Sequence, residues 1–171
     1  MANTYVKIGS TVTVGAGGSS TITFSSIPST YTDLKVVLSA RGTTSATWSD
    51  ISLLFNGSSA NFSAKMLYTT GLSVFSDPIT NTLRIPGPSS TASTFGNLEI
   101  YIPNYASSNN KSWSSDTVTE NNSSLANAVL NSLIAGLWSN SAAINSISFS
   151  ADGGGTFVQY TTATLYGISN S

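Results

Sequence analysis

"GNLEIYIPNY", residues 96–105, decides the fold class, because its apolar and polar side chains alternate strictly. In a β-strand, successive side chains point to opposite faces. Glu99 and Tyr101 would therefore lie on one face. The aliphatic side chains would share the other face: Leu98, Ile100 and Ile102. Such alternation predicts a strand with one face in a core, and it places Glu99 on the face away from that core.

The same period of two recurs along the chain, between clusters of Gly, Pro, Asn and Ser. The predicted strands lie within these segments: 20–26, 33–41, 50–57, 82–87, 144–150 and 162–168. The glycine-rich stretch 151–155 is typical of a tight turn. Residues 123–139 leave two structures open. Their spacing fits an amphipathic helix, but the continuous apolar run from 131 to 138 favours a strand, with a helical turn near Leu125 as an option.

Many short strands joined by polar loops, in a chain of 171 residues, predict an all-β fold with one antiparallel β-sandwich. We expect a jelly-roll-like arrangement with about eight strands and at most one short helix. The sandwich would comprise residues 20–171, preceded by an N-terminal strand or arm at 1–19 that is a candidate assembly anchor. The long polar segments 41–50 and 104–116 would form loops at its ends.

The composition combines a core with an unusually uncharged surface. The chain has 33 Ser and 22 Thr, 8% charged residues and 40% hydrophobic residues. A surface of hydroxyls and amides packs against neighbours with little desolvation of charge, which suits an assembly subunit. A net charge of −1 and six scattered cations give no basic patch for nucleic acid. The sequence shows neither a secretory signal nor an apolar segment long enough to span a membrane.

The absence of His and Cys excludes whole classes of chemistry. Ser-His-Asp and Cys-His catalysis both need a residue that this chain lacks, and so does every ordinary zinc site. Asp152 starts the sequence DGGG, which lacks the alternating oxygen ligands of a calcium loop, so a turn is the better interpretation. We therefore predict no catalytic residue, no metal and no cofactor.

Glu99 is the residue on which an enzymatic alternative would depend. Glycosidases use two carboxylates, and Glu99 could in principle act with Glu120 or an aspartate. Its position opposite the aliphatic face instead predicts a solvated or interface carboxylate. We expect Glu99 to pair with one of the six cations, within the chain or across a subunit contact.

Trp48 and Trp113 fall in the two long polar segments, beside Ser, Thr and Asn. Aromatic rings beside amides are a common sugar platform, so these two residues are candidate glycan contacts. The alternative is that each ring closes the end of the sandwich or an oligomer contact. Trp138 lies in the apolar run and is expected in the core.

Four stretches of the chain resemble a recurrent group of structural proteins from tailed bacteriophages of aquatic and cyanobacterial hosts. The matching motifs are F-x-x-I-P-x-x-Y-x-D-L at 24–34, E-I-Y-I-P-N-Y at 99–105, G-L-W-x-x-x-x-A-I-x-S-I at 136–147 and A-T-L-Y-G-I at 163–168. The resemblance covers about residues 20 to 168. It implies a non-enzymatic virion part with a jelly-roll-like sandwich, either on the capsid or in the tail, and it carries over no catalytic residue.

These observations together predict a capsid decoration, or cement, protein on the outer surface of the virion, made in the host cytoplasm. Its partners would be the major capsid protein and itself, as a homotrimer, with no nucleic acid and no membrane. The alternative is a tail-fibre or receptor-binding module that recognises host glycans. The candidate assembly residues are these: Tyr5, Val6, Ile8, Glu99 and Tyr101.

Overall fold

The computed structural model of the chain describes residues 4–44, 47–70, 73–119 and 130–169. The described part is all β, with twelve strands and no helix. The strands are β1 (Tyr5–Thr13), β2 (Thr21–Phe24), β3 (Asp33–Ala40), β4 (Trp48–Phe55), β5 (Phe62–Thr70), β6 (Ser73–Ile79), β7 (Thr82–Pro86), β8 (Gly96–Ile102), β9 (Lys111–Thr119), β10 (Leu130–Trp138), β11 (Ile147–Ala151) and β12 (Thr162–Ile168).

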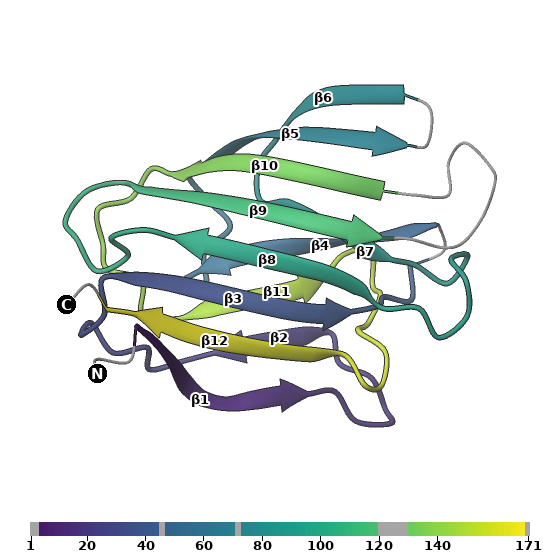
Figure 1. The fold of residues 1–171 in the computed structure, drawn as a ribbon, viewed down its shortest axis with the longest axis horizontal. Helices are drawn as coiled ribbons and strands as arrows, with labels where there is room; N and C mark the ends of the chain where they lie inside the picture. The colour runs from purple at the N-terminus through teal and green to yellow at the C-terminus, as the bar shows by residue number, and fades with distance from the viewer. Residues whose placement is uncertain (1–3, 45–46, 71–72, 120–129, 170–171) are drawn as a thin grey trace.

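The strands form two antiparallel sheets of unequal width. The larger has eight strands in the order β1-β12-β3-β8-β9-β10-β5-β6, and the smaller has four in the order β2-β11-β4-β7. Figure 1 shows the large sheet in front and the small sheet behind it, with β5 and β6 at one end of the large sheet. The small sheet thus covers one face of the large sheet, and the predicted β-sandwich is confirmed.

The pairing of strands is that of a jelly roll. Four antiparallel strand pairs are nested one inside the next and together form one long hairpin that folds over. The pairs are β1 with β12, β2 with β11, β3 with β8, and β4 with β7. This hairpin wraps so that β12 also pairs with β3, and β11 with β4. The eight strands involved form two sheets of four, as in the two Greek keys of a jelly roll.

The strand count of about eight was too low, because two hairpins are inserted into this jelly roll. β5 and β6 lie between β4 and β7 in the chain, and β9 and β10 lie between β8 and β11. β9 pairs with β8, β10 with β9, and β5 with β10, so both hairpins widen the same sheet. We call β9, β10, β5 and β6 the extension.

The ambiguous segment 123–139 ends in a strand. β10 runs from Leu130 to Trp138 and is paired along its whole length on both sides. The favoured strand interpretation is therefore confirmed, whereas the suggested helical turn near Leu125 lies outside the described residues. One face of β10 is buried, at Leu130, Ser132, Ile134 and Trp138, whereas Leu133 and Leu137 on the other face are exposed.

The core lies between the two sheets, where the alternation placed it. The aliphatic residues of the opening stretch are fully buried: Leu98, Ile100 and Ile102. Those of β3 lie beside them in register: Leu34, Val36 and Leu38. An aromatic group continues the core under the extension, with ring centroids 5.2 to 6.3 Å apart: Phe55, Phe62, Trp113 and Trp138.

Two of the scattered cations are buried and hold loops together. The Arg41 guanidinium donates four hydrogen bonds to backbone carbonyls within residues 88–94, at 2.7 to 3.3 Å. The Lys111 ammonium donates to the carbonyls of Ser107 and Asn109. Burial lowers the pKa of Lys111 below its ordinary value. Neither side chain presents its charge on the surface.

Candidate docking face

The face of the eight-stranded sheet that points away from the small sheet carries an unusual number of exposed apolar side chains. We call it the outer face. Among the described residues, the exposed large hydrophobic side chains other than Phe75 and Tyr160 belong to this face: Tyr5, Leu67, Val74, Tyr101, Val118, Leu133 and Leu137. Leu67 and Leu133 lie directly opposite each other on β5 and β10, and they are 47% and 60% exposed. Exposed apolar side chains gathered on one face indicate an interaction surface.

Several adjoining grooves cross the outer face, and two of them show how its polarity changes along the sheet. The larger, with a volume of about 620 Å³, runs from Tyr5 across Glu99 and Asp116 to Lys65 and the Leu67–Leu133 pair. The smaller, about 370 Å³, lies over the apolar end of the extension. Its apolar side chains are these: Leu67, Val74, Val118 and Leu133. The outer face is thus half polar, toward β8, and half apolar, toward β5.

Glu99 lies on the outer face, as its place in the alternation predicted. Its carboxylate forms an ion pair with the Lys35 ammonium on the neighbouring strand β3. The distance between Lys35 Nζ and Glu99 Oε2 is 2.7 Å. The hydrogen bond to Glu99 raises the pKa of Lys35 above its ordinary value. The expected pairing of Glu99 with one of the scarce cations is confirmed within a single chain.

Asp116 on β9 lies directly opposite Glu99 in the sheet register. Facing carboxylates on adjacent strands repel each other, and Lys35 offsets that repulsion on the Glu99 side. A glycosidase needs one carboxyl held in an apolar environment that keeps it protonated. Glu99 is 37% exposed and ion-paired, which suits the binding of a charged or polar group better than proton donation. Glu120 lies outside the described residues.

The other candidate assembly residues divide between two faces. The Tyr101 hydroxyl donates to Asp33 Oδ2 at 2.7 Å, and this hydrogen bond raises the pKa of Tyr101 to about 12. Tyr5 is 55% exposed and also lies on the outer face. Val6 and Ile8 are half-buried and alternate with Tyr5 along β1, so they point toward the small sheet. The structure therefore brings Tyr5, Glu99 and Tyr101 together and separates them from Val6 and Ile8.

The prediction that the two candidate glycan residues, Trp48 and Trp113, lie in end loops was wrong, because both belong to strands. Trp113 belongs to β9 and is 2% exposed on the inner face, where its indole lies so close to Gly136 that a Cβ there would be 2.1 Å from the ring. Trp48 is the first residue of β4 and is half-buried. The alternative interpretation, in which each ring packs against the protein, fits both positions.

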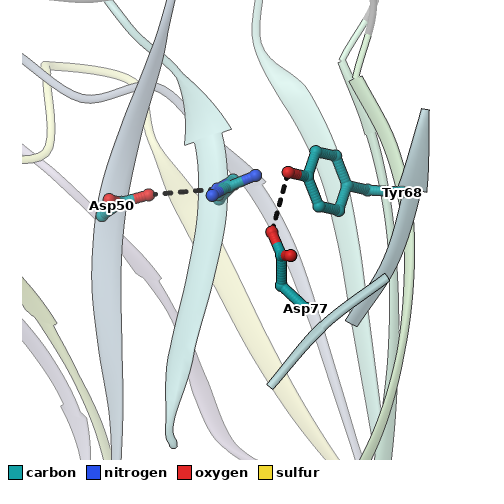
Figure 2. Close-up of polar contacts among 4 residues, drawn as sticks. Asp50, Tyr68 and Asp77 are labelled. Carbon is teal, nitrogen blue, oxygen red and sulfur yellow. Dashed lines mark hydrogen bonds and ion pairs between the residues drawn. The ribbon is translucent and has the colours of Figure 1, made fainter. Parts of the chain in front are cut away.

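A cluster around Arg84 was not visible in the sequence. The Arg84 guanidinium lies 5.1 Å from the ring centroid of Trp48 and 4.8 Å from that of Tyr68, so it contacts two aromatic rings. Its Nε lies 3.4 Å from Asp50 Oδ1, and the Tyr68 hydroxyl donates to Asp77 at 2.8 Å. Figure 2 shows Asp50 on one side of this cluster and Tyr68 with Asp77 on the other. The contacts join β4 and β7 to the β5–β6 hairpin.

The Asp50–Arg84 contact is a poor hydrogen bond despite its distance. Asp50 Oδ1 and Arg84 Nε are both buried without a partner of good geometry among the described residues. Burial raises the pKa of the Asp50 carboxyl, and the nearby Arg84 charge opposes that rise. We interpret the cluster as a clamp between the small sheet and the extension, because its contacts are made within the chain.

The described residues contain no group of three or more Asp and Glu side chains that could hold a metal ion. Asp152 instead accepts a hydrogen bond from the Ser52 hydroxyl at 2.8 Å. Gly153 and Gly154 follow with φ of 62° and 74°, so the predicted glycine turn is confirmed. No helix in the described part of the chain is long and apolar enough to cross a membrane.

The free edges of the large sheet are protected, in contrast to its outer face. β1 has an irregular register between Ile8 and Val12, with Gly9 at a φ of 68°. β6 contains Pro78, which has no N–H to donate to another strand. A bulge and an edge proline are both features that discourage edge-to-edge pairing. The outer face is therefore a better contact surface than either edge.

No protein-family model, curated protein or solved structure matches this chain.

Proposed function

We propose that this chain is a non-enzymatic structural subunit of a tailed-phage virion, and that it acts as a capsid decoration protein on the outside of the major capsid shell. The observation that carries the proposal is the outer face. Its exposed aliphatic side chains lie on a wide sheet whose free edges are protected, which is what a subunit that packs against other proteins through a sheet face needs.

The electrostatics of the molecule support an assembly role. Charged residues make up 8% of the chain, and the net charge is −1. Two cations are used inside to hold loops, and a third, Lys35, is neutralised by Glu99. Little charge must therefore lose its hydration when the surface is covered, which lowers the cost of association. The resemblance to phage structural proteins supports the virion as the place of assembly.

The copy number of the chain in purified virions tests this proposal. A decoration protein is present in numbers comparable with the major capsid subunit, and quantitative mass spectrometry measures that ratio. We also expect particles stripped of the protein to lose resistance to heat and low salt. A copy number that matches the tail fibres, or stripped particles as resistant as intact ones, would contradict the decoration role.

A further inference from the structure

We infer that a second copy of this chain covers the outer face, through a twofold contact centred on β10 between Leu133 and Ala135. The inference rests on the proposed assembly role of that face and names its occupant. Three features carry it: the charges that the chain itself leaves unpaired, their positions in the sheet register, and the size of the face.

The central strands of the outer face carry five charged side chains: Asp33, Lys35, Lys65, Glu99 and Asp116. Asp33 is buried and accepts the Tyr101 hydroxyl, so four of the five charges reach the surface, and one ion pair joins two of them. Lys35 and Glu99 form the ion pair at 2.7 Å. Lys65 and Asp116 are exposed and have no ion pair among the described residues. A partner that covers this face must therefore offer an anion to Lys65 and a cation to Asp116. A second copy has one of each.

The register places these two charges symmetrically about the apolar pair. Lys65 lies opposite Ala135, and Leu67 lies opposite Leu133, which in turn lies opposite Asp116. Lys65 and Asp116 thus occupy diagonal corners of a rectangle about 10 Å across the strands and about 7 Å along them. The centre of that rectangle lies on β10.

Consider a twofold axis that lies in the plane of the face, passes through this centre and is perpendicular to the line from Lys65 to Asp116. A half-turn about this axis exchanges the two corners. Lys65 of each copy then contacts Asp116 of the partner subunit, so one operation makes two ion pairs. The same rotation places the Leu67–Leu133 pair of one copy on that of the other. Such reciprocal contacts define an isologous twofold interface. The apolar centre and the charged rim follow the usual anatomy of a protein interface.

The face is large enough for a specific dimer. The proposed contact area comprises five adjacent strands in the order β8-β9-β10-β5-β6. Five strands give a width of about 24 Å, and strands of about eight residues give a length of about 27 Å. Covering this area removes roughly 650 Å² from each copy, or about 1,300 Å² in total, which lies at the lower end of specific interfaces. A trimer would instead need two different complementary patches. Among the described residues, the exposed large hydrophobics outside the outer face are only Phe75 and Tyr160.

Charge reversal tests the reciprocal contact. We expect sedimentation equilibrium of the full chain to give twice the 17.7 kDa chain mass. Lys65→Glu and Asp116→Lys should each raise the dissociation constant at least about tenfold, because each variant places like charges together twice. An equimolar mixture of the two variants should regain wild-type affinity as a heterodimer, because every pair in it is again of opposite sign. Lys7→Glu, an exposed reversal on the distant strand β1, is the matched control and should change nothing.

Several other results would contradict the proposed dimer. A monomeric wild type, a trimer, or a dimer that neither reversal weakens would each exclude this twofold contact. Mixing without recovery would show that Lys65 and Asp116 do not face each other. Circular dichroism checks that both variants fold, as expected for two exposed positions. A monomer in solution that is still abundant in virions would overturn the dimer and leave the proposed function standing.

Discussion

The jelly-roll half of the large sheet and the extension follow the same alternation with different residues. In β3 and β8 the inner side chains are aliphatic, and the outer ones include Lys35, Ser39 and Glu99. In β9 and β10 the buried inner side chains include four hydroxyls: Ser115, Thr117, Thr119 and Ser132. The outer face there carries Leu133 and Val118. The inner face of the extension therefore mixes hydroxyls with large apolar side chains such as Trp113, Ile134 and Trp138, while part of its aliphatic surface points outward.

The buried hydroxyls make the contrast quantitative. None of the four has a hydrogen-bond partner among the described residues. A buried hydroxyl without a partner costs on the order of 1 to 3 kcal/mol. Trp113, Ile134 and Trp138 offset part of this cost inside the sandwich, whereas Val118 and Leu133 point outward, where only another molecule can cover them. We therefore expect the extension to gain more stability from assembly than the jelly-roll half does.

The largest expected effect is in the jelly-roll half. Leu98→Ala removes a fully buried side chain between the two sheets and should lower the free energy of unfolding by about 3 kcal/mol. Leu137→Ala on the outer face of β10 removes the same atoms from a side chain that is 39% exposed. It should change the free energy of unfolding by less than about 0.5 kcal/mol. Urea unfolding measures both. Equal losses of unfolding free energy in the two variants would contradict the claim that the inner face is buried and the outer face is exposed.

Gly136→Ala sharpens the comparison inside the extension. A Cβ at Gly136 would lie 2.1 Å from the Trp113 indole, and the buried ring has little space to move. We expect a loss of about 1 to 3 kcal/mol in the free energy of unfolding, as for other overpacked cores. Gly57→Ala is not a suitable control, because Gly57 has a φ of 73°. Gly17→Ala, with open space around it, should have a much smaller effect.

Thr117→Val tests whether the buried hydroxyls are a burden. The methyl group replaces a hydroxyl that is buried and unpaired, at nearly constant volume. We therefore expect the protein to be unchanged or up to about 1 kcal/mol more stable in urea unfolding. A loss of more than about 1 kcal/mol would show that the hydroxyl has a bound partner, such as an internal water molecule.

The smallest expected effect concerns the tyrosine on the polar half of the outer face. The hydrogen bond to Asp33 raises the pKa of Tyr101 to about 12, above the ordinary value of about 10. Its contribution to stability is therefore complete below about pH 10 and is lost as pH rises through about 12. Because Tyr101 is 40% exposed, the effect should be a few tenths of a kcal/mol. Unfolding of wild type and Tyr101→Phe across this range should converge as pH rises; a constant difference would contradict the bond.

Sequence patterns predicted the jelly-roll half well, because its strands obey the binary pattern of aliphatic inside and polar outside. The same pattern predicts that Glu99 lies on the outer face, but it does not identify Lys35 as its partner. The extension was harder to predict. β9 buries Lys111 and three hydroxyls on the face where a core is expected, so the stretch looked like a polar loop. β6 is exposed on both faces and has no alternation at all.

The contacts that join distant strands could not be predicted from local patterns. Trp48, Tyr68 and Arg84 are far apart in sequence and meet only because β5 pairs with β10 and β4 with β7. The opposition of Glu99 and Asp116 likewise depends on the register of β8 with β9. Register across inserted hairpins is set by packing and turn geometry, and a single sequence does not show it.

The most direct test of the docking face is a single substitution at its centre. Leu133→Asp places a charge on a side chain that is 60% exposed in the single chain and central in the proposed contact. We predict that sedimentation equilibrium will show a dimer for the wild type and a monomer for Leu133→Asp, with nearly unchanged circular dichroism. Equal masses for the two proteins would contradict the claim that this face is covered by a second copy.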